Sequence, residues 1–319
     1  MTYFDAFNGD ADGICALTQL RNAKPRDSVL VTGVKRDISL LSKIEVTAGD
    51  SVTVLDISLD KNRGSLERIL NAGAEVFYVD HHFSGDIPAH KNLVATINTA
   101  ADVCTSILVN QHLNGAFTEW AIVGTFGDNL KNSAEILAKP LCLSQEKLGQ
   151  LENLGIYINY NGYGTELDEL HFSPAELYRL VSTYASPFQF IKDSGPNFQK
   201  LEIGYQQDMS AAASLEAEQQ SDSTAVFILP NEPWARRVSG VYSNDLANDN
   251  PSRGHAVLTV KANGNYLVSV RAPLKNKTGA DELVRRFPTG GGRKAAAGIN
   301  DLPADQLSDF IDQFKVFYS

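Results

Sequence analysis

The 319-residue chain is poor in cysteine and lacks long apolar runs. Its three cysteines, Cys15, Cys104 and Cys142, are scattered and odd in number, which argues against a disulfide framework and favours reduced thiols. No apolar run is long enough to span a bilayer. The start of the chain, Met1–Asp5, lacks the basic and apolar parts of a signal peptide. We therefore expect a cytoplasmic protein with no membrane partner.

The chain also lacks an excess of basic residues, with 28 Lys and Arg against 38 Asp and Glu and a net charge of −10. A long nucleic-acid polymer prefers a basic surface stripe, so such a partner is not expected. An anionic substrate would have to be small and held by a few local cations. A dinucleotide-binding fingerprint is absent too, because Asn8–Gly13 after the first predicted strand is acidic and would repel a pyrophosphate.

The length is that of about two domains of ~150 residues each. In the first half, short runs rich in Val, Ile, Phe and Tyr alternate with helix-like stretches, which predicts βαβ units and a parallel sheet. The predicted strands lie near residues 2–6, 29–33, 52–56, 75–80 and 93–97. Residues 117–185 look mainly helical, interrupted by an expected loop at Asn159–Gly164.

A polar stretch, Phe198–Gln220, has a helix-favouring composition, and after it the pattern changes to a small α+β domain. Asn263-Gly264 between two apolar runs is a two-residue hairpin signal. The strands predicted there are Thr224–Leu229, His255–Lys261 and Tyr266–Arg271. The fold class we predict is α/β: a doubly wound parallel-sheet domain (1–190), a helical connector (191–222) and a smaller α+β domain (223–319), with a cleft between.

Acidic and histidine side chains follow three of the predicted strands. Asp56 ends one apolar run, Asp80-His81-His82 closes the next, and the first strand leads into a segment that holds Asp10 and Asp12. Open parallel sheets place ligand sites at the carboxyl ends of their strands, so we expect these side chains to meet at one edge.

Carboxylates gathered in this way repel one another. Two like unit charges 4 Å apart repel by ~4 kcal/mol at an effective dielectric constant near 20. One or two bound divalent cations would turn this net repulsion into attraction. His81 shifts the preference from Mg²⁺ toward Mn²⁺. Asp128, next to Gly127 after an apolar run, is a further candidate ligand. A single aspartate at a strand end is usually a turn or helix cap, but the set together favours a metal site.

The order and spacing of these motifs resemble the DHH-family phosphoesterases, which include the RecJ exonucleases and the nano-RNases. Asp10-Ala11-Asp12-Gly13 resembles the first motif, Asp56 the second, Asp80-His81-His82 the third and Asp128 the fourth. Gly290–Gly298 resembles the glycine-rich motif of the DHH-associated domain. The resemblance implies two Mn²⁺ ions in the first domain, substrate anchoring by the second, and hydrolysis of phosphodiesters in short oligonucleotides or signalling dinucleotides.

Two positions depart from the family pattern. Nano-RNase-like members usually carry His shortly before the first Asp, where this chain has Ala6 and Asn8, and we expect Asn8 to act as an oxygen ligand. The glycine-rich motif commonly continues with His, where this chain has Arg293. The expected metal ligands are Asn8, Asp10, Asp12, Asp56, His81 and Asp128. The expected catalytic residues are Asp56, Asp80, His81 and His82.

Substrate anchoring is expected from the second domain. The backbone of Gly290, Gly291 and Gly292 can form an anion-binding nest, after which Ala295–Ala297 would start a helix. Arg293 and Arg271 could clamp a phosphate, and Asn244 could bind a base or ribose edge. The alternatives are a flexible hairpin for the glycine triplet, surface ion pairs for the two arginines and a helix cap for Asn244.

The predicted function is Mn²⁺-dependent hydrolysis of short 5′-phosphorylated oligonucleotides, especially linear dinucleotides such as pGpG or pApA, to mononucleotides. Asp56 would bridge two ions that activate a hydroxide for in-line attack, with Mg²⁺ less favoured. Alternatives are a cyclic-dinucleotide or 3′-phosphoadenosine 5′-phosphate hydrolase, a RecJ-like exonuclease, and a non-catalytic nucleotide sensor. Thiol chemistry is disfavoured because Cys15 and Cys104 fall in apolar, helix-like segments. The oligomeric state stays open, a homodimer included.

Overall fold

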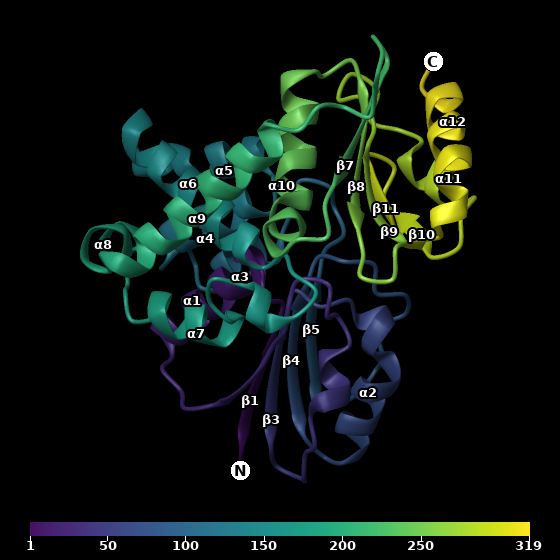
Figure 1. Ribbon diagram of the computed structural model, residues 1–319. Coiled ribbons are helices and arrows are strands. Elements are labelled where there is room, and N and C mark those ends of the chain that lie inside the picture. Colours follow the sequence, from purple (N-terminus) through teal and green to yellow (C-terminus); the bar gives the residue numbers. More distant parts are fainter. The chain divides into compact units, whose positions relative to one another are not determined.

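The computed structural model describes residues 1–319, which form two compact units, Met1–Glu202 and Ile203–Ser319 (Figure 1). The boundary falls inside helix α9 (Pro196–Ala213), within the stretch predicted as a helical connector. The domain limits at 190 and 222 remain predictions. None of the helices combines the length and the apolar character that a bilayer span requires.

The first unit is built on a five-stranded sheet in the order β2-β1-β3-β4-β5, in which every neighbouring pair is parallel. Its strands are β1 (Tyr3–Phe7), β2 (Val29–Val31), β3 (Ser51–Leu55), β4 (Glu75–Asp80) and β5 (Leu93–Ile97). All five were predicted from the apolar runs, so the parallel α/β class is confirmed.

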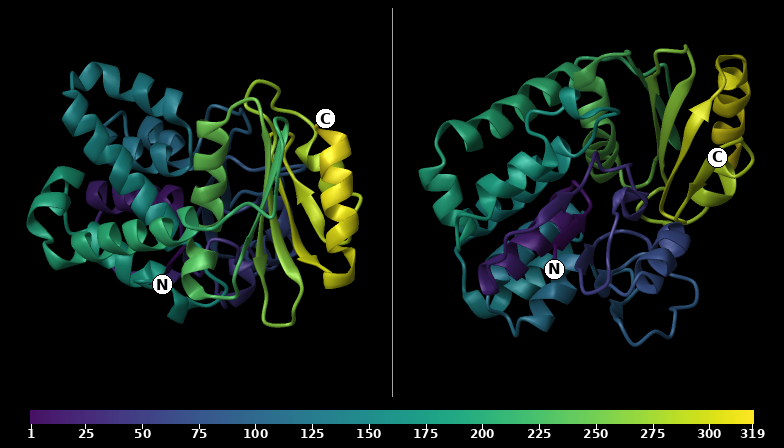
Figure 2. Two further views of the ribbon diagram at one scale, coloured as in Figure 1. Left: turned by 45° about the horizontal axis from the view of Figure 1, so that its top comes forward. Right: turned by 90° about the horizontal axis from the view of Figure 1, so that it is seen from below.

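Helices cover both faces of this sheet (Figure 1 and Figure 2). On one face, Val52, Val54 and Tyr78 pack in an apolar cluster with α2 (Leu59–Asn71) and the 3₁₀ helix η1 (Leu40–Lys43). Successive residues of a strand alternate between faces, so the neighbours of these residues face the opposite layer. That layer includes α1 (Ala11–Ala23), α3 (Thr105–His112), α4 (Thr118–Gly127), α6 (Gln145–Asn161) and α7 (Pro174–Val181). The remaining helices of the unit are α5 (Lys131–Ala138), η2 (Lys139–Leu141), η3 (Leu167–Glu169) and α8 (Pro187–Asp193).

The strand register aligns the ends that carry the acidic residues. Phe7 pairs with Leu55, and Leu55 pairs with Val79. The next residues continue the ladder, since the Asn8 amide donates to the Leu55 carbonyl at 3.2 Å and the Asp56 amide to the Val79 carbonyl at 3.1 Å. Asn8, Asp56 and Asp80 therefore leave the sheet side by side.

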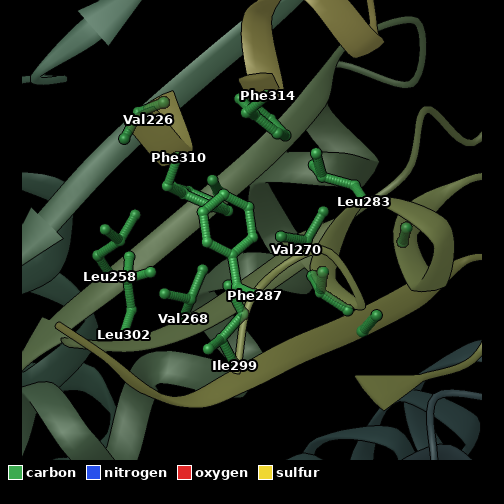
Figure 3. Packing of buried hydrophobic residues seen from close by; sticks show 14 of the residues in the cluster. Val226, Leu258, Val268, Val270, Leu283, Phe287, Ile299, Leu302, Phe310 and Phe314 are labelled. Carbon is green, nitrogen blue, oxygen red and sulfur yellow. The ribbon is translucent and has the colours of Figure 1, made fainter. Parts of the chain in front are cut away.

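The second unit contains a six-stranded sheet in the order β10-β11-β9-β8-β7-β6, in which only β7 and β8 are parallel. Its strands are β6 (Gln219–Gln220), β7 (Thr224–Leu229), β8 (Gly254–Val260), β9 (Tyr266–Arg271), β10 (Gly290–Gly292) and β11 (Ala296–Leu302). On one face, Phe310 and Phe314 pack on Val268 and Val270, and Figure 3 shows Phe287 and Leu283 beside them. These side chains join the sheet to α11 (Ala280–Val284) and α12 (Leu307–Phe317), the latter preceded by η4 (Ala304–Gln306).

Helix α10 (Pro233–Asp249) contacts β8 and β9, whose other face carries the apolar cluster. The predicted hairpin between β8 and β9 is confirmed, with Gly264 at φ 82° in its turn.

Two local expectations were wrong, and so was the helix-cap alternative for Asn244. Ala296 and Ala297 belong to strand β11 and not to a helix, because they pair with β9 and β10 and sheet pairing overrides the helix preference of alanine. Asn159–Asn161 form the last turn of α6, and the chain leaves the helix only at Gly162. Asn244 does not cap a helix, since it lies inside α10.

Candidate metal centre

Four predicted ligands converge at the carboxyl edge of the first unit's sheet. One ligand atom each of Asp12, His81 and Asp128 lie within 4.8 Å of one another, and so do ligand atoms of Asp56, His81 and His82. The His81 Nε2 atom is 3.4 Å from Asp56 Oδ1 and 3.7 Å from Asp128 Oδ2. Since His81 belongs to both groups, the two form one continuous cluster.

Two polar atoms of the cluster have no partner within the protein. Asn8 Oδ1 and Asp80 Oδ2 are buried and accept no hydrogen bond. A buried acceptor without a donor carries a desolvation penalty of about 1–3 kcal/mol, so such atoms call for an explanation. For Asn8 Oδ1, an oxygen-ligated cation supplies one, because amide and carboxylate oxygens both suit hard divalent ions. The donor set therefore fits a divalent metal.

Histidine 81 is held in the orientation that a ligand needs. Its Nδ1 atom lies 2.9 Å from the carbonyl oxygen of Val103, which can only accept a hydrogen bond. The proton is thus assigned to Nδ1, and the lone pair of Nε2 points at the carboxylates of Asp56 and Asp128.

Histidine 82 is positioned by the carboxylate that begins the same motif. Its Nδ1 atom is 2.8 Å from Asp80 Oδ1 and 3.8 Å from Asp56 Oδ1. Burial alone would lower the pKa of His82, but the hydrogen bond to Asp80 and the charges of Asp56 and Asp80 outweigh it and raise this pKa. With 43% of its side chain exposed, His82 can reach a bound molecule while Asp80 stays fully buried.

Aspartate 10 carries a cation already, which the sequence reasoning missed. The Lys35 ammonium lies 2.6 Å from Asp10 Oδ2 and 2.8 Å from Asn159 Oδ1. The other oxygen of Asp10 accepts from the Gly13 amide at 3.1 Å and caps α1. Burial alone would raise the pKa of Asp10, yet Lys35 and the Gly13 amide lower it below the usual value.

Aspartate 12 is oriented by the start of helix α3. Its two carboxylate oxygens accept from the backbone amides of Thr105 and Ser106, each at 2.7 Å. The first turn of a helix presents unpaired N–H groups and partial positive charge, which favours an anion there. The loop before α3 thus fixes two ligands at once, Asp12 through these amides and His81 through Val103.

The two remaining carboxylates, Asp56 and Asp128, are buried close to other negative charges. Burial, together with the charges of Asp10 and Asp12, raises the pKa of Asp56 well above its ordinary value. Burial also raises the pKa of Asp128. Asp56 further sits at φ 59°, an uncommon backbone conformation for a residue other than glycine. A divalent cation would relieve both carboxylates, since it favours their charged forms.

The cysteines take no part in this chemistry. Cys15 and Cys104 are fully buried and unpaired, as predicted for core residues. Burial and the nearby Asp12 carboxylate raise the pKa of both thiols well above normal, so neither is a thiolate at neutral pH.

In the second unit, two predicted anchor residues meet each other. The Arg271 Nε atom donates to Asn244 Oδ1 at 2.7 Å, and its Nη1 atom donates to Ser269 Oγ at 3.0 Å. Asn244 therefore orients the guanidinium group at the end of β9. A guanidinium group held in this way keeps a permanent positive charge at a fixed place, which would attract a phosphate.

Of the three consecutive glycines, two leave no room for a side chain and one does. A side chain at Gly290 would collide with the Val284 carbonyl oxygen, and Gly292 has φ 141° and lies against the backbone of Ala297. At Gly291 a Cβ atom would meet nothing within 4 Å, so only this glycine leaves its surroundings open. Arg293 lies in the turn between β10 and β11, exposed and without a side-chain hydrogen bond or ion pair.

The residues that sequence reasoning missed share one trait, which is that they act through the predicted ligands. Lys35 lies in the loop after β2, one residue beyond Val34, where the only signal was a basic residue beside a glycine-containing turn. Thr105 and Ser106 contribute backbone amides, which any residue type would supply. No motif could have identified these two positions.

Comparison with known proteins places the fold but gives no close relative. No family model and no curated protein matches the chain. The exonuclease RecJ bound to manganese is 16% identical, with a TM-score of 0.64 over 99% of this chain and 90% of that chain. The pGpG-specific phosphodiesterase PggH from Vibrio cholerae is 15% identical, with a TM-score of 0.59 over 99% and 100%. CDC45 from Entamoeba histolytica is 9% identical, with a TM-score of 0.53 over 100% and 95%.

These similarities extend over the whole chain, so both units belong to one shared architecture. The protein has the two-domain α/β fold of RecJ and PggH, with a parallel sheet in the first unit and a mixed sheet in the second.

Proposed function

We propose that the protein is a divalent-metal-dependent phosphodiesterase that hydrolyses short 5′-phosphorylated oligonucleotides, above all linear dinucleotides such as pGpG or pApA, to mononucleotides. The observation that carries the proposal is the cluster of Asp12, Asp56, His81 and Asp128, with two buried, unpartnered oxygen acceptors beside it. The shared fold with the pGpG-specific PggH and with manganese-bound RecJ supports the substrate class and the metal.

Asp10, Asp12, Asp56, His81 and Asp128 would hold two Mn²⁺ ions, with Asn8 as an oxygen ligand. Bound there, the metal supplies a nucleophilic water and polarises a phosphoryl oxygen. Asp56 would be the shared ligand, because it lies near His81 and interacts with the carboxylates of Asp10, Asp12 and Asp128.

Histidine 82 would work on the substrate and not on the metal. Asp80 accepts the Nδ1 proton and favours the imidazolium form, so the exposed ring can contact a phosphate oxygen or donate a proton to the leaving group. Arg271, oriented by Asn244, would bind a terminal phosphate, with Arg293 and the open backbone at Gly291 as further contacts.

The short substrate follows from charge. A net charge of −10 disfavours a long polyanion, so we expect affinity to come from local groups such as Arg271. We expect turnover to fall steeply beyond a few nucleotides.

A length panel tests the proposal. Purified protein with Mn²⁺ is offered pGpG, pApA, five- and twenty-nucleotide strands, a cyclic dinucleotide and 3′-phosphoadenosine 5′-phosphate, and kcat/KM is measured for each. The linear dinucleotides should be preferred. Equal values for a dinucleotide and a twenty-nucleotide strand would indicate an exonuclease, and binding without turnover of any member would indicate a sensor.

A further inference from the structure

Directly after the third motif, one aromatic side chain projects into solvent beside the candidate metal centre. Phe83 follows His82, so their Cα atoms are about 3.8 Å apart. Phe83 is 72% exposed, whereas the phenylalanines at the core of either unit, such as Phe7 and Phe310, are fully buried. A scattered exposed apolar residue is ordinary, so exposure alone carries no argument. The surroundings of this one do.

Hydrogen bonds hold the backbone at Phe83 and just after it. The Ser58 hydroxyl donates to the Phe83 carbonyl at 3.1 Å. The Arg63 guanidinium donates to the carbonyls of Ser84 and Asp86, each at 2.7 Å. Ser58 and Arg63 belong to the start of α2, which begins shortly after the candidate ligand Asp56. The backbone that carries the ring is therefore held by two residues of the segment that follows the candidate ligand Asp56.

We propose that Phe83 is a stacking platform for the nucleobase of the nucleotide whose phosphate contacts His82. Every base has an apolar π face, and aromatic side chains bind such faces with little sequence preference. An exposed ring one residue from His82 suits a ligand that joins a phosphate to a flat base. The proposal rests on the proposed function for its substrate and adds the residue that binds the base.

A base-deletion cycle tests the platform. The kcat/KM of wild type and Phe83→Ala is measured on pGpG and on analogues in which one or the other guanine is replaced by an abasic ribose. On pGpG the substitution should lower kcat/KM about 5- to 100-fold, the range expected for one base–aromatic stack, mainly through KM. On the analogue that lacks the stacked base, the substitution should change kcat/KM less than about twofold, because the base and the ring act together.

Two matched variants complete the test. Phe83→Trp should keep or improve the KM for pGpG, since a larger ring stacks at least as well. Val94→Ala is the control, because it also removes an exposed apolar side chain, 61% exposed on β5. Val94 pairs with Phe77, which lies three residues before the end of β4, so this variant should leave KM unchanged. An equal loss on pGpG and on both abasic analogues, or no loss on pGpG, would overturn the stacking role.

A binding readout separates this inference from the proposed function. The tryptophan fluorescence of Phe83→Trp is followed while GMP is added in the presence of Mn²⁺, with wild type as the blank for the native tryptophans. Saturable quenching is expected. Quenching without hydrolysis of any substrate would reject the proposed function and keep the platform, whereas hydrolysis of pGpG without quenching would reject the platform alone.

Discussion

The strand ends of the first unit and the predicted anchor residues of the second unit differ in how firmly their charged side chains are held. In the first, Asp12, Asp56 and His81 are buried, and each has a hydrogen bond that fixes its direction. In the second, Asn244 and Ser269 hold the half-buried Arg271, whereas Arg293 is exposed at a hairpin turn and makes no side-chain hydrogen bond. Chemistry requires groups fixed before the substrate arrives, whereas anchoring tolerates groups that adapt to it.

A second contrast lies within the first sheet, where two buried aspartates on neighbouring strands differ in what surrounds them. Asp5 is paired with Arg21 through both carboxylate oxygens and accepts a hydrogen bond from Ser28 at 2.7 Å. Asp56 has a hydroxyl at 3.2 Å and otherwise faces other carboxylates and histidines. The first serves stability, and the second is held at a cost that a metal would offset.

The largest effect should separate these two aspartates. Asp56→Asn should lower kcat/KM at least about a thousandfold, because a bound metal contributes several kcal/mol to the transition state. Its metal-free form should be as stable as wild type, since the substitution removes a repelled charge. Asp5→Asn should instead cost about 3–5 kcal/mol of stability, because it leaves Arg21 without its buried partner.

Denaturant unfolding and activity per folded molecule decide between the two roles. The contrast fails if Asp56→Asn unfolds the metal-free protein while Asp5→Asn leaves both stability and metal binding unchanged.

A somewhat smaller effect is expected at Lys35, the cation within the carboxylate cluster. Lys35→Met should destabilise the protein in EDTA by less than the about 3–5 kcal/mol of a fully buried pair, since 22% of the Lys35 side chain is exposed. Saturating Mn²⁺ should shrink this difference, because the metal takes over the charge compensation of Asp10. Melting temperatures of both proteins with and without Mn²⁺ measure this, and an equal loss in both conditions would show that Lys35 is merely structural.

The second unit buries a titratable group in its neutral form, which sharpens the comparison. His255 is fully buried, neither ring nitrogen makes a hydrogen bond of normal geometry, and burial together with Arg253 lowers its pKa from 6.5 to about 4. His255 therefore binds a proton below pH 6.5 in the unfolded chain but only below about pH 4 in the folded chain. Stability should be complete above pH 6.5 and fall by up to about 3 kcal/mol as the pH drops toward 4.

The variant His255→Leu removes this dependence. Burial raises the pKa of Asp245 to about 6, which acts with the opposite sign, but it does so in both proteins. The difference between wild type and variant thus isolates His255. As the pH falls from 7.5 to 4.5, the unfolding free energy of the wild type should decrease relative to that of His255→Leu. Parallel curves for the two proteins would refute the assignment.

The smallest effect is expected at the adaptable anchor. Arg293→Ala should raise the KM for 5′-phosphorylated dinucleotides roughly ten- to a hundredfold, since one charged hydrogen bond contributes ~1.5–3 kcal/mol. Hydrolysis of bis-p-nitrophenyl phosphate, which offers no terminal phosphate to the anchor, should be nearly unaffected. Gly291→Ala is the companion variant, because it folds without a clash and adds a side chain where a ligand would approach. An equal loss on both substrates for Arg293→Ala would reject the anchoring role.

Much of the first unit was predictable because its signals are local. Apolar runs set the strands, and the rule for parallel strand ends brought Asp56 and Asp80 together before any coordinates. Lys35 and the α3 amides were not predictable, since they reach the site through loops whose course depends on the whole fold. In the second unit, the helix predicted at Ala296 and Ala297 was wrong, because their pairing with β9 and β10 outweighed the local helix preference of alanine.

The most direct test of the central claim is add-back of metal to metal-depleted protein. The protein is treated with EDTA, exchanged into metal-free buffer, and its rate of pGpG hydrolysis is followed as Mn²⁺ is added. The buried carboxylate and histidine cluster predicts no turnover without metal and a saturable return of activity with Mn²⁺, absent from Asp56→Asn. Full hydrolysis of pGpG in metal-free buffer would contradict the account.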